Sequence, residues 1–461
     1  MTATLVLTDG LERELVASLA DPRETAAVIL ARKVDSEAGI RLLARRIMWV
    51  DQASYLKRTA TAMTITSSGY VHALGAAEAD GAIAIWFHTH PGVDSTPSPS
   101  RHDRIVDDQI SGLFRLRSGS ETYGTLIIAP AGAGYAFTGS FENETGEKAP
   151  LDRIWSVGEA WRLRQSFSAT YAPADPIFDR NVRAFGPDIQ RILGELTIAI
   201  VGSGGTGSAV AEQLVRLGVR KLILIDADTL SETNVTRVYG STPTDVGVPK
   251  AQALAAHLRQ IAPDLSCTAI QGMVTLETVA RTLRAADVVF GCTDDNAGRL
   301  VLSRLSTYYL TPVIDVGVLL SSDAAGMLTG IDGRITTMTP GSACLVCRDR
   351  IDLARAAAEL KTPGERKRLA DEGYAPALGQ TEPAVVAYTT AAAAAAVNEL
   401  LDRLIGFGPP DRPTETLLRL HEREISTNHA SPRERHYCHS SQGKWGAGDA
   451  TPFLEQLWPA D

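Results

Sequence analysis

The sequence predicts an α/β protein of two domains, and three observations lead to this prediction. The chain has 461 residues, which is more than one ordinary domain needs. Apolar segments typical of buried strands alternate with amphipathic helical segments along most of its length. A glycine-rich run, GSGGTGS at 202–208, stands between a strand-like segment and a helical one.

The first part of the chain contains short strands and helices in alternation. Amphipathic spacing predicts helices over LERELVASLA (11–20) and RHDRIVDDQISGLFRL (101–116). Apolar runs predict strands, which are ETAAVILAR (24–32), RRIMWV (45–50), GAIAIWFHTH (81–90), TLIIAP (125–130) and GYAFTGSF (134–141). The proline-rich segment YAPADPIFDR (171–180) then separates two patterns, so we expect a domain at 1–165, a linker at 166–179 and a second domain at 180–461.

The second part contains a repeated strand–helix pattern without an internal sequence repeat. The expected strands are LTIAIVG (196–202), KLILIDAD (221–228), DVVFGCT (287–293) and TPVIDVGV (311–318), and SAVAEQLVRLGV (208–219) is the first helix between them. Apolar strands that alternate with helices form a mostly parallel sheet covered on both faces.

Composition excludes several classes of protein. The formal net charge is −9 and no block of Lys or Arg stands out, so we expect no nucleic-acid partner. The N-terminal residues lack the basic start and apolar core of a signal peptide. No apolar run is long enough for a membrane span, and TTAAAAAAVNELLDRL (389–404) has the composition of a helix in a soluble protein. Five cysteines do not make a disulfide scaffold, and the default expectation is a cytoplasmic protein.

The stretch HTHPGVDSTPSPSRHD (88–103) is the first candidate site. His88 and His90 are two residues apart at the end of a strand, so both imidazoles point to the same face. Asp103 stands at the start of a helix, from which its carboxylate can turn back towards them. Two histidines and one aspartate leave one position of a tetrahedral zinc open for water, which is the catalytic pattern. Ser100 could donate a hydrogen bond to a developing oxyanion. Alone, an HxH pair is also common in strands that bind no metal.

The full string HTHP…SxxD resembles the JAMM motif of the JAB/MPN metalloproteases, which cleave peptide or isopeptide bonds after ubiquitin-like proteins. The resemblance implies a general base on an earlier strand, and Glu24 in PRETAAVIL matches that position. The alternative for Glu24 is a solvated residue at a helix–strand junction. We interpret His102 as a surface residue rather than a ligand.

The glycine run is the second candidate site. Gly202, Gly204, Gly205 and Gly207 would allow a tight turn and a close approach of phosphates to the helix that follows. Asp226 ends the next strand, where an acidic residue commonly binds a ribose. Taken alone, this pattern fits a nicotinamide-dependent dehydrogenase equally well.

The segments DADTLSETNVTR (226–237), VGVPKAQAL (246–254) and GCTDDNAGR (291–299) follow in order. They resemble the ThiF/MoeB adenylyltransferases and the adenylation domains of ubiquitin-activating enzymes. The resemblance implies a Rossmann-like domain in which Arg237 and Lys250 bind ATP phosphates, Asp294 positions Mg²⁺ and Asn234 lies beside the nucleotide. That family usually has CTDN where this chain has an additional aspartate. Arg299 keeps its usual distance from Asp294, which favours that aspartate for the metal.

Two further features belong to the same resemblance. FDRNVRAFG (178–186) is similar to an arm that carries an arginine across to a partner subunit, which would make Arg180 part of the neighbouring site in a homodimer. A linker arginine is the alternative. The family often has a structural zinc held by two cysteine pairs. Here Cys344, Cys347 and Cys438 are present, Ser441 stands where a fourth cysteine would be, and either His436 or His439 could complete a Cys3His site. Three free thiols are the alternative.

Together the resemblances imply a bifunctional enzyme. A zinc metalloprotease would trim a ubiquitin-like protein. An ATP- and Mg²⁺-dependent adenylyltransferase would activate the exposed carboxylate in a bacterial conjugation pathway, with a conjugating enzyme as a further partner. The first alternative is a sulfur carrier that is processed for cofactor or metabolite biosynthesis, and the second is a non-catalytic regulator. No cysteine occurs between Arg348 and Tyr437, so we expect direct transfer or an oxyester on a hydroxyl such as Thr381, beside Glu382, and no thioester.

Overall fold

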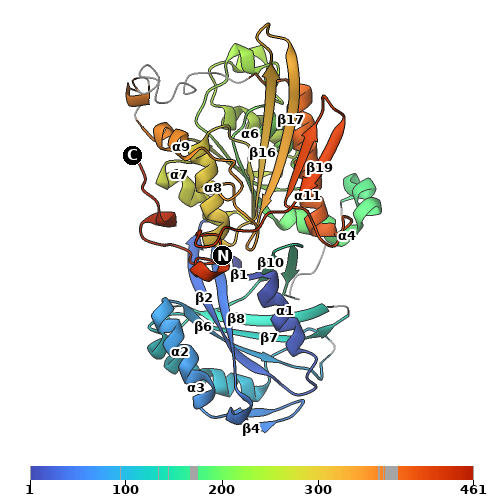
Figure 1. Cartoon of the computed structure of the whole chain (residues 1–461). Coiled ribbons are helices and arrows are strands. Elements are labelled where there is room, and N and C mark those ends of the chain that lie inside the picture. The colour runs from blue at the N-terminus through green and yellow to red at the C-terminus, as the bar shows by residue number, and fades with distance from the viewer. Residues whose placement is uncertain are drawn as a thin grey trace. The chain divides into compact units, whose positions relative to one another are not determined.

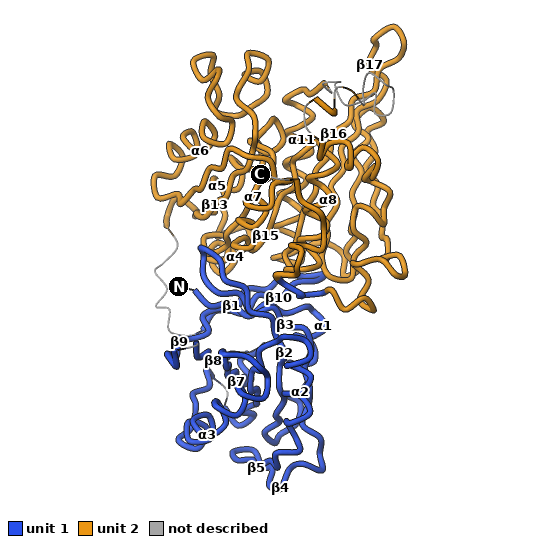
Figure 2. The backbone as a smooth tube through the Cα atoms, turned by 90° about the vertical axis from the view of Figure 1, so that its left-hand side faces the viewer, with its two compact units in different colours: residues 1–172, 445–448 blue, residues 173–444, 449–461 orange. Residues whose placement is uncertain are grey.

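The computed structural model describes residues 2–93, 95–132, 134–143, 145–166, 175–361, 364–366, 368 and 383–459 (Figure 1). It divides the chain into two compact units (Figure 2). Unit 1 contains Met1–Ala172 and Trp445–Gly448, and unit 2 contains Pro173–Lys444 and Asp449–Asp461. Four residues near the C-terminus therefore belong to the N-terminal unit, which the expectation of a single second domain over 180–461 did not include.

Unit 1 is built on a mixed sheet of nine strands in the order β11-β10-β1-β3-β2-β6-β7-β8-β9, with a separate hairpin of β4 and β5. Its strands are β1 Thr2–Thr8, β2 Ala26–Ser36, β3 Gly39–Trp49, β4 Tyr55–Arg58, β5 Met63–Ile65, β6 Ile83–Thr89, β7 Tyr123–Ala131, β8 Gly134–Glu142, β9 Lys148–Pro150, β10 Arg153–Val157 and β11 Arg162–Gln165. Its helices are α1 Asp9–Ser18, α2 Ser68–Asp80 and α3 Arg101–Ser118.

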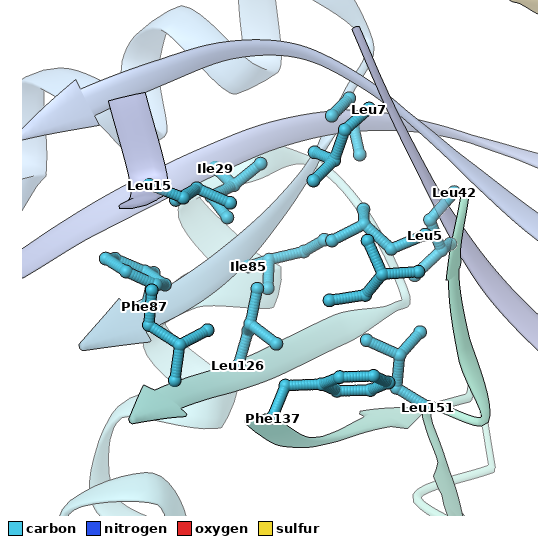
Figure 3. Packing of buried hydrophobic residues seen from close by; sticks show 14 of the residues in the cluster. Leu5, Leu7, Leu15, Ile29, Leu42, Ile85, Phe87, Leu126, Phe137 and Leu151 are labelled. Carbon is cyan, nitrogen blue, oxygen red and sulfur yellow. The ribbon is translucent and has the colours of Figure 1, made fainter. Parts of the chain in front are cut away.

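The alternation of side chains along the strands produces two cores in unit 1. On β2, Ala27 and Ile29 belong to the cluster that includes Leu15 of α1, whereas Val28 and Leu30 belong to the cluster on the opposite face, with residues of α2 and α3. Figure 3 shows part of the first cluster, in which leucine and phenylalanine side chains from several strands fill the space beside Leu15. Both faces of the central strands are covered, so β2 is buried and apolar from Ala26 to Ala31 and β6 from Ile83 to Phe87.

Unit 2 is built on a sheet of eight strands in the order β14-β13-β12-β15-β16-β17-β18-β19. Its strands are β12 Thr197–Val201, β13 Lys221–Asp226, β14 Ser266–Gln271, β15 Val288–Gly291, β16 Val313–Ser322, β17 Leu328–Met338, β18 Glu415–Arg419 and β19 Glu424–Asn428. Its helices are α4 Asp179–Glu195, α5 Gly205–Arg216, α6 Lys250–Ile261, α7 Glu277–Thr282, α8 Asn296–Tyr309, α9 Leu353–Glu359 and α11 Val386–Ile405.

The strand order of unit 2 confirms the expected Rossmann-like arrangement with a mostly parallel sheet and adds an antiparallel extension at one edge. Strands β12 to β16 are parallel, as expected, but β17, β18 and β19 add to β16 by antiparallel pairing. The chain moves from β12 to β13 and β14 on one side and returns to β15 and β16 on the other. A crevice therefore forms between the carboxyl ends of β12 and β15, where ligands of such sheets bind.

Two glycines make the turn after β12 possible. Gly202 has φ +96°, and a Cβ there would lie 2.5 Å from the carbonyl oxygen of Cys292. A Cβ at Gly207, on α5, would lie 1.8 Å from the carbonyl oxygen of Gly202. A side chain at Gly207 would push α5 away from the turn, and one at Gly202 would collide with the backbone that follows β15.

In the described part of the chain, no helix combines the length and apolar character needed to cross a membrane. The longest helix, α11, is instead half-buried against α5 and strands β16 and β17 within unit 2.

Candidate functional site

The end of β6 in unit 1 brings the three predicted zinc ligands together. The Nε2 atoms of His88 and His90 are 3.1 Å apart, and each is 3.5 Å from a carboxylate oxygen of Asp103. Ligand atoms about 2.0–2.1 Å from a tetrahedral zinc would be about 3.4 Å from each other. The spacing of these donors therefore fits one zinc ion, and one tetrahedral position remains for a further ligand.

The first turn of α3 aims the carboxylate of Asp103 at the histidines. Ser100 is the N-cap of this helix, and its Oγ accepts a hydrogen bond of 3.1 Å from the backbone N–H of Asp103. Asp103 Oδ2 in turn accepts from the backbone N–H of Ser100 at 2.6 Å. Burial alone would raise the pKa of Asp103, but hydrogen bonding with His88 and His90 holds this pKa well below its usual range. The hydroxyl proton of Ser100 takes no part in the capping box.

Glu24 lies just before β2 and is almost completely buried. Its backbone N–H donates to Thr59 O and its carbonyl accepts from Arg58 Nε, both at 2.8 Å. Ala26 is directly opposite His88 in the sheet, so continuing this register places Glu24 beside His90. Burial raises the pKa of Glu24, which is the direction that suits a group that takes up a proton near neutral pH. His102, by contrast, is exposed.

A cavity of about 1070 Å³ opens at the carboxyl ends of the parallel strands in unit 2. The predicted nucleotide-site residues that line it are Gly202, Gly204, Gly205, Asp226, Arg237, Lys250 and Asp294. These residues come from four segments that are far apart in the sequence. The fold therefore gathers most of the expected nucleotide site around a single space.

Asp226 and Lys250 are already held in place by neighbouring groups. Asp226 accepts hydrogen bonds from the backbone N–H groups of Ser203, at 2.6 Å, and Asp228, at 2.9 Å. Burial raises the pKa of Asp226. Lys250 Nζ is 2.7 Å from the exposed carboxylate of Asp228, and Arg237 donates to the carbonyl of Thr233 at 3.1 Å. An incoming phosphate could replace these exposed partners.

The structure distinguishes the two consecutive aspartates after β15. Asp295 is the N-cap of α8, where its side chain accepts from the backbone N–H of Gly298 and from the hydroxyl of Thr293. Asp294 is exposed to the cavity, and its carboxylate has no hydrogen-bond partner among the described residues. Helix capping thus occupies Asp295 and leaves Asp294 available for a cation.

Three other predicted residues do not line this cavity. Gly207 is a packing position between α5 and the sheet. Asn234 is buried, and its side chain accepts from the backbone N–H of Ser231 at 3.1 Å, which completes the capping box of a short 3-10 turn whose N-cap is Ser231. Arg180 is exposed in the first turn of α4. Thr381 and Glu382 lie outside the described residues.

Four side chains of unit 2 form a second cluster of metal-binding type. The ligand atoms of Cys344, Cys347, His436 and Cys438 all lie within 4.8 Å of one another. The sulfurs of Cys347 and Cys438 are 3.6 Å apart, and His436 Nδ1 is 3.2 Å from Cys438 Sγ and 3.6 Å from Cys344 Sγ. A tetrahedral zinc at ordinary bond lengths would separate such donors by about 3.6–3.8 Å.

The geometry of this cluster selects between the two histidines that the sequence left open. His439 is directed to Ser441, whose hydroxyl is 2.7 Å from its Nδ1, and it caps a short 3-10 turn. A hydrogen bond from the Cys438 thiol lowers the pKa of Cys344 to about 5. The three sulfurs and the imidazole of His436 thus supply four candidate ligands, which would fill all positions of a tetrahedral ion.

The comparison with known families matches residues 178–440 of this chain to the ThiF family, over more than half of its length. The chain belongs to the ThiF family. The match begins just before α4 and ends after Cys438, so the cavity and the Cys/His cluster both lie inside the ThiF region, whereas the His88 site lies outside it.

Several characterised proteins are similar to the ThiF region. The SAMP-activating enzyme E1 of Haloferax volcanii is 28% identical over 162 residues, which are 35% of this chain and 56% of that protein. The sulfur carrier protein ThiS adenylyltransferase of Escherichia coli is 31% identical over 153 residues, 33% of this chain and 57% of that protein. The crystal structure of E. coli MccB with ATP aligns with a TM-score of 0.46 and 17% identity over 57% of this chain and 74% of that chain. The chain spans little more than half the length of the two enzymes.

The ThiF region also contains cavity residues that sequence reasoning missed. They lie on the antiparallel part of the sheet and beside it, and they are Gly317, Asp332, Arg334, Arg350, Arg355 and Arg419. Asp315, just behind this lining, is completely buried. The one signal in the sequence was an aspartate inside the apolar run TPVIDVGV, because a charged residue is rarely buried in a strand without a partner.

Proposed function

We propose that unit 2 adenylates the C-terminal carboxylate of a ubiquitin-like protein. One observation carries this proposal: Asp226, Arg237, Lys250 and Asp294 line a single cavity beside the glycine turn. Similarity to enzymes whose names state that they activate SAMP or adenylate ThiS supports the choice of a small carrier protein as substrate.

In the proposed reaction, a carboxylate oxygen of the partner attacks the α-phosphorus of ATP. A new O–P bond forms, the bond from the α-phosphorus to the β,γ-bridge breaks, and pyrophosphate leaves with the electron pair. Arg237 and Lys250 would offset phosphate charge, and Asp226 would bind the ribose. Asp294 would hold Mg²⁺, which supplies further charge neutralisation on the phosphates.

Pyrophosphate exchange into ATP tests this proposal. The exchange should require a ubiquitin-like protein with a free C-terminus, and Lys250→Ala or Asp294→Ala should abolish it, because each removal leaves phosphate charge or its cation unsupported. Asp295→Asn is the matched control, since asparagine also caps a helix, and it should keep most of the exchange. NADH binding without exchange for any partner would instead support a dehydrogenase.

Arg180 should act in a neighbouring subunit, because it is exposed on α4 and does not line the cavity of its own chain. A homodimer of Arg180→Ala and Asp294→Ala subunits would then contain about one complete site, although each variant alone is inactive. Mixtures that recover no exchange activity would count against this arrangement.

We also propose that unit 1 is a zinc-dependent peptidase that trims the same kind of partner. The observation that favours it is the spacing of His88, His90 and Asp103 around one open ligand position, with buried Glu24 beside them. Bound zinc would lower the pKa of a water ligand to about 7. Glu24 would take the proton from that water and deliver it to the leaving amine, while the Ser100 hydroxyl could donate to the oxyanion.

Cleavage of a ubiquitin-like protein that carries extra residues after its C-terminal glycine tests the peptidase proposal. His88→Ala should remove both one zinc per chain and all cleavage. His102→Ala, which changes an exposed histidine in the same segment, should keep both. Cleavage by His88→Ala at the wild-type rate would exclude the site.

The fate of the adenylate differs between conjugation and sulfur transfer. We propose direct transfer to a nucleophile of another protein, because the described cysteines after β17 all belong to the Cys/His cluster. Intact mass spectrometry of enzyme, ATP and partner, with and without thiol and hydroxylamine, separates the outcomes. A thiol-sensitive adduct on Cys344, Cys347 or Cys438 would show that the cluster is catalytic. A hydroxylamine-sensitive adduct would show an oxyester.

A further inference from the structure

Behind one part of the cavity wall, a buried carboxylate is shared by two arginines. Asp315, on β16, is completely buried. Arg334 Nη2, from the neighbouring strand β17, donates to Asp315 Oδ2 at 2.5 Å, and Arg299 Nε, from α8, lies 3.4 Å from Asp315 Oδ1. Both arginines line the cavity. Two positive charges with one negative charge leave this corner with a surplus of one positive charge.

Apart from Arg237, which we assign to the ATP phosphates, the other cavity arginines are paired with carboxylates. Arg350 forms two hydrogen bonds with buried Glu415, at 3.1 and 2.7 Å, and Arg355 is bonded to Glu359 at 3.0 Å. Arg419 faces Asp332 across the sheet and is 3.2 Å from Glu424. By contrast, the buried Nε atoms of Arg299 and Arg334 have no hydrogen-bond partner among the described residues. These Nε atoms face the protein interior, but no described residue accepts a hydrogen bond from the Nη atoms of Arg299, and among the same residues Arg334 donates only through Nη2, to Asp315. Nη donors of both guanidiniums therefore remain for a ligand.

Gly317 leaves the space in front of the two arginines open. It lines the cavity, and a Cβ built on it would lie 3.4 Å from Arg334 Nη2 and 3.6 Å from Arg299 Nη2. The place where any other residue would begin its side chain is thus flanked by two guanidinium nitrogens. Asp315 pairs directly with Gly291 of β15, only three residues before Asp294. The open space is therefore next to the loop that carries the proposed Mg²⁺ residue.

We propose that Arg299 and Arg334 form a carboxylate-binding subsite over Gly317, which holds the C-terminal carboxylate of the polypeptide to be adenylated. This inference rests on the proposed adenylation. A carboxylate that approaches a triphosphate is repelled by it, so a second cationic centre is needed to hold the nucleophile in position. Guanidinium groups bind carboxylates with well-defined geometry, which suits this task.

Asp315 is the positioning residue of the subsite. Its two oxygens each face one arginine, so it fixes the direction of both side chains without reaching the ligand itself. The missing side chain at Gly317 admits the extended end of a polypeptide, and a terminal glycine is the residue that fits closest to the arginines.

The test uses the full-length protein and isothermal titration calorimetry. The probe is N-acetyl-glycylglycine, added in the presence of Mg²⁺ and α,β-methylene-ATP, and the C-terminal amide of the same peptide is the uncharged comparison. We expect the acid to bind at least tenfold more tightly than the amide. Arg334→Ala and Gly317→Ala should each remove this preference, while affinity for the ATP analogue changes less than about twofold.

We expect Gly317→Ala to fold normally, because the added methyl group lies at ordinary contact distances from its neighbours and needs no unusual φ. A loss of preference in this variant therefore cannot be attributed to misfolding. Arg419→Ala is the matched control, an arginine of the same cavity with carboxylate partners of its own, and it should keep the preference for the acid. Equal binding of acid and amide by the unchanged protein would overturn the inference, as would a preference for the acid that survives in both Arg334→Ala and Gly317→Ala.

The nucleotide arm of the experiment separates this inference from the proposed function. If the unchanged protein binds the ATP analogue and Lys250→Ala does not, the proposed nucleotide site is supported, independently of the peptide-binding result. If Arg334→Ala weakens the ATP analogue as strongly as it weakens the peptide acid, the cluster binds phosphate and the carboxylate subsite is wrong.

Discussion

The two clusters of candidate metal ligands in this protein use similar residue types in different surroundings. In unit 1, His88, His90 and Asp103 provide three ligands, and His90 and Asp103 are only half-buried. In unit 2, Cys344, Cys347, His436 and Cys438 provide four ligands, of which all three cysteines are buried. An open position next to a buried acid, Glu24, suits catalysis, whereas a closed tetrahedron suits a structural role.

The comparison shows that the number and burial of the candidate ligands, more than their residue types, distinguish the two clusters. Each cluster contains at least one histidine, and each depends on residues that approach from separate segments. What separates them is the space around the expected ion. Substitutions at the unit 1 cluster should therefore change activity, and substitutions at the unit 2 cluster should change stability. The opposite result would contradict the catalytic and structural roles assigned to them.

The largest expected effect is on catalysis in unit 1. Glu24→Gln should reduce cleavage of the ubiquitin-like partner by roughly 10²–10⁴-fold, because only the proton transfer is lost. The bound zinc and the melting temperature of the protein should stay close to the wild-type values. Metal content by atomic emission and cleavage rates measure both. Full peptidase activity in this variant would remove Glu24 from the mechanism.

The second effect is on the stability of unit 2. Cys438→Ser should remove one zinc per chain and lower the free energy of unfolding by about 4 kcal/mol, the value expected when metal exceeds its dissociation constant about a thousandfold. Cys267→Ser is the matched control, because this cysteine stands outside the cluster and should keep the metal. Urea unfolding with metal analysis measures the change. Retained zinc and unchanged stability would mean that the cluster is a set of free thiols.

The third effect is the loss of stability of unit 2 at low pH, to which the buried carboxylate of Glu415 contributes. Burial would raise the pKa of Glu415, but hydrogen bonds from Arg350 and Asn428 lower it from 4.5 to about 2. Because the pKa of Glu415 is lower in the folded protein than in the unfolded chain, this group stabilises the folded state at pH values above about 4.5. The contribution is lost as the pH falls from about 4.5 to about 2. The full shift corresponds to about 3 kcal/mol.

Glu415→Gln should therefore reduce stability at pH 7 and flatten the loss of stability in acid. Urea unfolding at pH 7, 4 and 3 compares the two proteins. A variant that loses stability in acid as steeply as the wild type would show that other carboxylates control the acid response of unit 2.

The smallest effect is at the start of α3 in unit 1. Ser100→Ala should lower stability by about 1 kcal/mol, because the N-cap oxygen that accepts from Asp103 N–H is lost. Ser100→Gly should lower stability by only about a few tenths of a kcal/mol. This variant removes the hydroxyl but largely keeps the helix start, so it separates the effect on capping from the effect on catalysis. If Ser100→Gly is stable and fully active, Ser100 contributes a helix cap and no oxyanion donor.

The sequence by itself determined much of this protein. Alternating apolar strands and helices predicted the two α/β units, and the GSGGTGS turn before a helix located the cavity of unit 2. The period of two along β6 was enough to place His88 and His90 on one face, and CLVC with the later Cys438 indicated a metal cluster. These features are local, because strand pleating, helix initiation and turn geometry depend on neighbouring residues.

Tertiary structure alone decided the rest. Spacing to Arg299 favoured Asp294, and the structure added the physical reason that Asp295 caps α8. The position of His439 against Ser441 left His436 as the fourth member of the Cys/His cluster. The pairing of β16 with β17 put Arg334 over Asp315, 19 residues away in the chain. Such contacts depend on strand register and on how distant segments pack. The pattern of apolar residues in the sequence does not predict which polar groups will be in contact.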